Sequence, residues 1–218
     1  MVLAAGCTDL PTPAELARPQ VLAVRADPPA LPAGERAELT VLVAGPDGAM
    51  TDLDVTWAVA EPTPQLPAIG DIEVDGDGRV WYVAPDEVDE VTGTSVEATV
   101  RVDDETTLIA LKGVAVGVAM PTVNPIITDL FVGGDSVDDG GTATLSGDEP
   151  VSLDIAVDPP GSNNATTSWY ATLGEIELYR RTPTEILPAE EPGNGSLFVV
   201  YRDERGGVTW RAIGVTFP

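Results

Sequence analysis

Residues 95–102 read Ser-Val-Glu-Ala-Thr-Val-Arg-Val, so that an apolar side chain stands at every second position. A second apolar run, 108–111, follows a short polar stretch. Successive side chains of a β-strand point to opposite faces, so a period of two indicates a strand with one buried face. The two runs together predict an antiparallel β-hairpin.

The same alternation occurs on both sides of this hairpin, at residues 37–43 and 151–157. Turn-forming sequences such as Pro46-Asp47-Gly48 and Gly206-Gly207 separate the alternating runs. Many short strands divided by turns are typical of antiparallel sandwiches. The sequence therefore predicts an all-β fold.

The chain also contains this pattern twice. The first copy consists of Val55-Thr56-Trp57, Gly70-Asp71-Ile72 and the hairpin 95–111, and the second of Thr167-Ser168-Trp169, Gly174-Glu175-Ile176 and the hairpin 196–211. We expect both tryptophans to be core residues on equivalent strands, because a large ring is best accommodated between two sheets.

These residues resemble a known arrangement. A tryptophan strand, a Gly-x-Ile segment, a strand closing on Ala84-Pro85 and an Arg202-Asp203 hairpin resemble the tandem immunoglobulin-like domains of bacterial surface lipoproteins and adhesins. The resemblance covers nearly all of residues 20–218. It implies two tandem immunoglobulin-like antiparallel β-sandwiches that display, space or bind, and it transfers no catalytic residue.

The expected boundaries place the first domain at residues 20–118 and the second at residues 126–218. Pro121 and Pro125 punctuate the short linker 119–125 between them. So few residues predict a stiff tandem rather than two freely moving domains.

The beginning of the chain suggests an anchor. The run Leu3-Ala4-Ala5-Gly6-Cys7 resembles the lipobox of bacterial lipoproteins, and Cys7 is the only cysteine. We expect residues 1–6 to be the remnant of a lipoprotein signal, Cys7 to be lipidated, and residues 7–19 to form a flexible Pro-rich tether. The expected location is the bacterial cell envelope, at the outer membrane or cell surface. The alternative is an ordinary terminus with an incidental cysteine.

Composition excludes several functions. There are 36 acidic against 11 basic residues, a net charge of −25. Such a surface repels phosphate backbones, so no nucleic-acid partner is expected. The chain has no histidine, which excludes Ser-His-Asp and Cys-His catalysis and histidine-ligated zinc. With one cysteine, no intrachain disulfide can form. We therefore expect a protein that is not an enzyme.

Acidic loops are the candidate metal sites. Asp75 and Asp77 lie in an Asp-Gly-Asp-Gly stretch, and Asp135, Asp138 and Asp139 form a second cluster. Carboxylate oxygens are calcium ligands, but Asp-Gly pairs are also hairpin-turn signals. We favour turns and keep calcium as the alternative; no other cofactor is expected.

The candidate binding loop is the hairpin tip at Arg202, Asp203, Glu204 and Arg205, since sandwiches carry binding sites on their loops. The competing interpretation is a turn whose charges satisfy one another.

Together these features predict a non-enzymatic, lipid-anchored protein of the cell surface or periplasm whose domains act as spacers or bind an unidentified protein or glycan. One alternative is a structural subunit of an extracellular assembly, joined through exposed strand edges. Another is a secreted hydrolase that uses carboxylates, or its accessory module.

Overall fold

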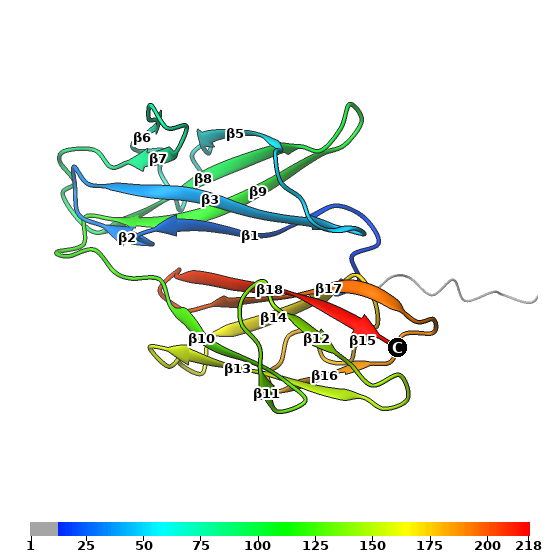
Figure 1. Ribbon diagram of the computed structural model, residues 1–218. Coiled ribbons are helices and arrows are strands. Elements are labelled where there is room, and N and C mark those ends of the chain that lie inside the picture. Colours follow the sequence, from blue (N-terminus) through cyan, green and yellow to red (C-terminus); the bar gives the residue numbers. More distant parts are fainter. Residues whose placement is uncertain (1–12) are drawn as a thin grey trace, which may run out of the picture.

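The computed structural model describes residues 13–218, and all its regular elements are β-strands (Figure 1). Cys7 and the lipobox lie outside the described residues. Two β-sandwiches follow one another along the chain, so the predicted all-β fold with tandem immunoglobulin-like domains is confirmed. Among residues 13–218 no helix is long and apolar enough to cross a bilayer.

The first domain has nine strands: β1 (Gln20–Asp27), β2 (Ala30–Leu31), β3 (Arg36–Gly45), β4 (Gly48–Ala49), β5 (Asp54–Val59), β6 (Asp71–Val74), β7 (Val80–Val83), β8 (Thr92–Arg101) and β9 (Thr107–Val116). One sheet has the order β1-β3-β7-β6, with β4 added to β3, and the other has the order β2-β9-β8-β5. All pairings are antiparallel except that of β2 with β9.

The second domain also has nine strands: β10 (Ile126–Val132), β11 (Asp135–Ser136), β12 (Thr142–Thr144), β13 (Val151–Asp158), β14 (Thr166–Ala171), β15 (Glu175–Ile176), β16 (Thr184–Leu187), β17 (Gly193–Arg202) and β18 (Val208–Phe217). Its sheets have the orders β11-β10-β13-β16-β15 and β12-β18-β17-β14. Apart from β4 in the first domain and β11 in the second, each strand of one domain has a counterpart in the other.

The hairpin predicted at residues 95–111 is formed by β8 and β9, which pair from Thr92 with Val116 to Arg101 with Thr107. Val96, Ala98 and Val100 are fully buried, and the residues between them are partly exposed. The alternation therefore marks one buried face, because burying every second side chain removes apolar surface from water while leaving polar neighbours solvated.

The two cores are built around different aromatic residues. Trp169 is completely buried in the second domain, and its indole N–H donates to the backbone oxygen of Arg181 at 2.8 Å. The first domain instead buries Tyr82, whose hydroxyl donates to the backbone oxygen of Ile69 at 3.1 Å. Trp57 packs against that core but stays partly exposed. The expectation of two equivalent core tryptophans holds fully only for Trp169.

The described end of the predicted tether is packed against the protein rather than solvated. Ala14 and Leu16 are each only 1% exposed. The backbone N–H of Leu16 donates to the oxygen of Ala171, and the N–H of Ala171 donates to the oxygen of Ala14, both at 3.0 Å. This short segment therefore docks beside β14 of the second domain before the chain enters the first domain.

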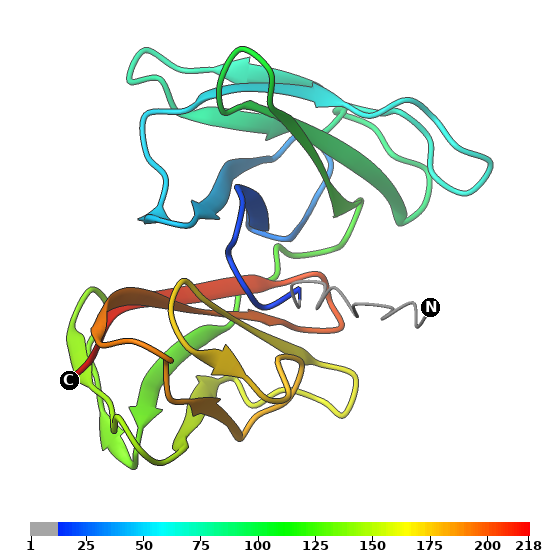
Figure 2. The same cartoon turned by 90° about the vertical axis from the view of Figure 1, so that its right-hand side faces the viewer.

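The two sandwiches are stacked on one another instead of being joined end to end. In Figure 1 the strands of both domains run across the picture, with β1 and β3 facing β17 and β18. In Figure 2 the segment leading into β1 (dark blue) passes between the two domains. The side formed by β1 and β9 thus lies over the outer face of the β12-β18-β17-β14 sheet.

Candidate functional site: the junction between the two domains

A third apolar cluster, separate from the two cores, fills the junction. It consists of Leu16, Leu22, Ala23, Ala44, Phe198, Val200 and Val208, with Leu42, Tyr170, Trp210 and Ala212 packed around them. Phe198 is 1% exposed and Val200 is 0% exposed although both point away from the core of their own domain. Each side chain of this size contributes roughly 1.5–3 kcal/mol when fully buried. The cluster therefore holds the domains in one relative orientation.

An arginine–tryptophan contact extends this cluster. The guanidinium carbon of Arg25, on β1, lies 4.9 Å from the centre of the Trp210 ring on β18. A cation over an aromatic face is attracted by the ring's electron density, and this contributes about 0.5–2 kcal/mol depending on solvation. The Nε atom of Arg25 is buried and has no hydrogen-bond partner among residues 13–218. The stacking on Trp210 is thus the main favourable contact of this guanidinium in the described structure.

The linker takes part in the junction through one side chain. Asn124 donates its amide to the backbone oxygen of Ala26 at 2.9 Å and accepts a hydrogen bond from the backbone N–H of Val208 at 2.8 Å. One amide side chain thereby ties β1 of the first domain to the start of β18 in the second. The stiffness expected from the short linker stays a prediction, and this bridge is a physical reason for it.

The two domains also approach each other closely at the turn after β3, which contains Gly48. Gly48 has φ of 107°, a conformation that side chains rarely adopt, and a Cβ atom there would lie 2.8 Å from Oγ of Ser196. Only glycine avoids both penalties at this position. The turn after β3 can therefore approach β17 of the second domain directly.

A cavity of about 290 Å³ lies in the junction next to this cluster. Its walls are β1 (residues 21–24), β9 (residues 110–113) and the β17–β18 hairpin (residues 202–208). Lys112, the only lysine of the chain, is 7% exposed there and donates to the backbone oxygen of Gly206. Burial lowers the pKa of Lys112 to about 8; Asp203 acts in the opposite direction, and Arg202 lowers the pKa further.

The predicted binding loop at the tip of this hairpin is divided between two roles. Arg202 and Asp203 line the cavity, and Arg202 donates to the backbone oxygen of Leu22 in the first domain. Asp203 accepts hydrogen bonds from the backbone N–H groups of Arg205 at 2.9 Å and Gly207 at 2.6 Å. These contacts belong to the junction and to the turn itself.

Glu204 is turned away from the cavity. Its carboxylate accepts hydrogen bonds from the Ser162 hydroxyl at 2.6 Å and the Asn164 amide at 3.3 Å. The Ser162 bond, followed by the Asn164 bond and the charge of Arg205, lowers the pKa of Glu204. The structure does not bring the four charged residues of the tip together as one surface.

The Asp75 loop is satisfied by donors of its own. The carboxylate accepts hydrogen bonds from Trp81 Nε1 at 3.1 Å and from the backbone N–H groups of Asp77 at 2.9 Å and Arg79 at 3.0 Å. The Trp81 bond is the largest cause that lowers the pKa of Asp75. Arg79 forms ion pairs with both acids, at 3.1 and 3.2 Å. These contacts fit the turn interpretation.

The second acidic cluster is also dispersed. Asp135 belongs to β11, while Asp139 accepts a hydrogen bond from the backbone N–H of Ala212 at 3.0 Å and Asp138 accepts one from Gly141 through its backbone oxygen at 2.9 Å. Across residues 13–218 no three His, Cys, Asp or Glu side chains are grouped so that they could hold a metal ion.

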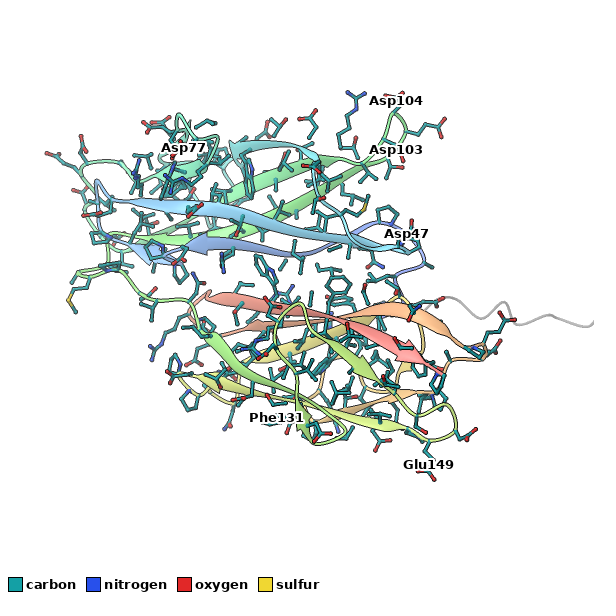
Figure 3. The ribbon with its side chains drawn as sticks, viewed as in Figure 1. Asp47, Asp77, Asp103, Asp104, Phe131 and Glu149 are labelled. Atoms are coloured by element: carbon teal, nitrogen blue, oxygen red, sulfur yellow. The ribbon has the colours of Figure 1, made fainter. Side chains whose placement is uncertain are left out.

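Other acidic side chains lie far from the junction. Figure 3 shows Asp77, Asp103 and Asp104 on the side of the first domain remote from the second, and Glu149 at the opposite end of the molecule. Hydrogen bonds from the backbone N–H groups of Glu105 and Thr106 lower the pKa of Asp103, which marks a tight turn. These acidic side chains are therefore displayed on the outer surfaces, whereas Asp203 is the carboxylate that lines the junction cavity.

Comparison with known proteins finds similar chains only among solved structures, and these include immunoglobulin-like and fibronectin(III)-like modules. No protein-family model matches it, and no curated protein matches it. Among solved structures, the N-terminal Ig1-2 module of the Drosophila receptor protein tyrosine phosphatase DLAR is 11% identical, covers 92% of this chain and 99% of its own, and has a TM-score of 0.34. The fibronectin(III)-like modules of Clostridium thermocellum CbhA are 12% identical, cover 91% and 93%, and have a TM-score of 0.32.

Proposed function

We propose that this protein is a non-catalytic, lipid-anchored module of the bacterial cell envelope whose two immunoglobulin-like domains act as a single binding unit. The observation that carries the binding role is the junction, where an apolar cluster, the Asn124 bridge and the Arg25–Trp210 contact fix the domains against each other. A preorganised pair presents a fixed surface and loses little entropy on binding.

Stacking favours binding over spacing. A spacer increases its reach when its domains are joined end to end, whereas these domains lie on one another (Figure 1). The docked segment also shortens the tether, because Ala14 already contacts the second domain. Ala14 lies seven positions after Cys7, and a fully extended chain spans at most ~3.5 Å per position, or about 25 Å. An acylated Cys7 would therefore hold the second domain close to the membrane.

The anchor is tested by expressing the protein behind a complete lipoprotein signal in a bacterial host. With Cys7 intact, the protein is expected to enter the detergent phase on phase separation and to incorporate radiolabelled palmitate. Two or more acyl chains, at ~0.8 kcal/mol per buried methylene, make the attachment effectively permanent.

Cys7→Ser should move the protein to the aqueous phase, while Thr8→Ser serves as the matched control and should leave it in the detergent phase. Equal partitioning of the Cys7→Ser variant and the unchanged protein would remove the lipid anchor from the proposal.

A second candidate, a subunit of an extracellular assembly, is favoured by one feature. Within the described residues, positions 107–114 of β9 pair with β8 on one side and with no strand on the other. Ile109 and Leu111 on this strand are 65% and 63% exposed. An uncovered apolar edge strand is a template for pairing with another chain.

Light scattering at rising protein concentration separates the two candidates. Self-assembly through β9 predicts a mass that increases with concentration and returns to the monomer value in Ile109→Lys, because a charge on the edge opposes pairing and Ile109 does not line the junction cavity. A binding unit of one chain predicts the monomer mass for both proteins. The hydrolase alternative gains no support from the junction cavity, where Asp203 is the single carboxylate lining residue.

A further inference from the structure

The junction cavity contains a buried cation with unused hydrogen-bonding capacity. An ammonium group has three N–H donors. Lys112 is 7% exposed, and in the described structure the backbone oxygen of Gly206 is the single acceptor that its ammonium contacts. Burying a charge without full pairing costs free energy, so two donors beside a cavity indicate a place for an acceptor that binds there.

The polar end of the cavity carries a net positive charge. Lys112 and Arg202 both line it, against the single carboxylate of Asp203. One oxygen of Asp203 is already held by two backbone N–H groups, those of Arg205 and Gly207. In a chain of net charge −25, a cavity with two cations and one anion is complementary to an anionic group.

The remaining walls are apolar. Val21, Leu22 and Val24 of β1, Leu111 of β9 and Val208 of β18 line the cavity. Its volume of about 290 Å³ lies just below the range for small-molecule sites, about 300–1,000 Å³, and domain interfaces are a preferred place for such sites. A ligand that fits must combine one anionic group with a short apolar body.

We propose that the junction cavity binds a small monocarboxylate, with its carboxylate on the ammonium of Lys112 beside Arg202 and its hydrocarbon part against the β1 and β18 side chains. The inference rests on the proposed binding role of the domain pair and gives that role a ligand class. Because residues from both domains form the walls, the ligand also stabilises the stacked arrangement.

Binding is coupled to the protonation of Lys112. Three groups set its pKa of about 8 in the free protein: the apolar surroundings lower it, Asp203 raises it and Arg202 lowers it. The residues of β1 that line the cavity are Val21, Leu22, Ala23 and Val24, none of which titrates. A bound carboxylate favours the charged ammonium, so ligand binding should raise the pKa of Lys112, and affinity should fall as pH rises above 8.

The chain's single lysine makes the test direct, since protein labelled with ¹³Cε,¹⁵Nζ-lysine gives one side-chain signal to follow by NMR. The protein used is Cys7→Ser, so that the result does not depend on lipid attachment. Hexanoate is titrated as the probe, with hexylamine and hexan-1-ol as controls of the same apolar length. We expect a saturable shift and a raised pKa with hexanoate and neither effect with the two controls.

Calorimetry of a matched pair of variants completes the experiment. Lys112→Met keeps a long apolar side chain without the charge and should weaken hexanoate binding about tenfold or more. Arg79→Met removes a cation from the distant Asp75 loop and should leave binding unchanged. A hexanoate titration without saturation, or an equal response to hexan-1-ol, would overturn the carboxylate site and leave the anchored binding unit to be judged by its own partition test.

Discussion

The two domains share the order of their strands but differ in what covers the outer face of the hairpin sheet. In the second domain this face, on β17 and β18, lies beneath the first domain (Figure 2). In the first domain the corresponding face, on β8 and β9, leaves Ile109 and Leu111 exposed. The outer face of the hairpin sheet is therefore an interface in the second domain, whereas in the first domain it carries exposed apolar side chains.

The sequences of the two equivalent strands β8 and β17 explain the difference. In β8 every second residue is buried, and Ser95, Glu97 and Thr99 stand between them. In β17 the residues 197–201 are all buried, because Phe198 and Val200 replace polar outer-face residues. Continuous apolar runs are typical of strands covered on both faces. The strand in which apolar and polar residues no longer alternate, β17, is thus the strand that lies at the interface between the two domains.

The largest expected difference between the two domains is the loss of stability when the core tryptophan of each is removed. Trp169→Ala should lower the free energy of unfolding by about 3–5 kcal/mol, because it empties a site that is fully enclosed. Trp57→Ala should cost clearly less, since this ring is partly solvated before the change. Urea denaturation followed by far-ultraviolet circular dichroism measures both variants. Equal losses would mean that the two tryptophans are equivalent, as the sequence repeat alone suggests.

Titration of Lys112 gives an effect of intermediate size. Its folded pKa of about 8 lies below the ordinary lysine pKa of 10.5, so between these values the unfolded chain holds a proton that the folded protein lacks. The contribution of this group to the free energy of unfolding therefore rises with pH in that window, by at most ~1.4 kcal/mol per pH unit. Lys112→Met should remove this contribution.

Urea denaturation of both proteins from pH 7 to pH 9.5 provides the measurement. The chain has no other lysine, so the difference between the two slopes reports this group. Parallel slopes would show that the ammonium is not buried and that the junction is open to water.

Salt and divalent ions should have the smallest effect on stability. With a net charge of −25, sodium chloride is expected to raise the melting temperature smoothly, mainly below ~0.15 M, as screening relieves repulsion between like charges. In 0.15 M salt, millimolar calcium and magnesium should then give the same small response. A saturable rise in melting temperature with calcium alone would instead support a metal site. The variants Asp75→Asn and Asp139→Asn would then show in which domain it lies.

Periodicity and the sequence repeat sufficed to predict part of the strands of each domain, because alternation depends only on neighbouring residues. The hairpin 95–111, the strand before Trp169 and the glycine-led strands at Ile72 and Ile176 all occur where the sequence predicts them. These features are local, so one sequence is enough to infer them.

The junction could not be predicted in the same way, because it depends on contacts between residues far apart in the chain. Lys112 and Gly206, or Asn124 and Ala26, have no sequence signal that links them. The apolar run 197–201 is the one local indication, and the sequence repeat assigns it only to a hairpin strand. The docking of Leu16 was missed because a short Pro-flanked segment has the composition of a solvated tether.

The central claim is that the two sandwiches form one stacked unit held by the outer face of β17. Phe198→Glu places a charge inside the junction cluster, while the core of the second domain, to which Phe198 does not belong, stays intact. Thr99→Glu adds the same charge to the partly exposed outer face of β8 and serves as the matched control. Circular dichroism verifies that both variants are folded.

Small-angle X-ray scattering then measures the maximum dimension of each protein in solution. The account predicts a compact particle for the unchanged chain and for Thr99→Glu, and an elongated particle for Phe198→Glu, in which the domains separate. If the unchanged chain were already elongated, or if folded Phe198→Glu kept the compact shape, the stacked unit would be contradicted.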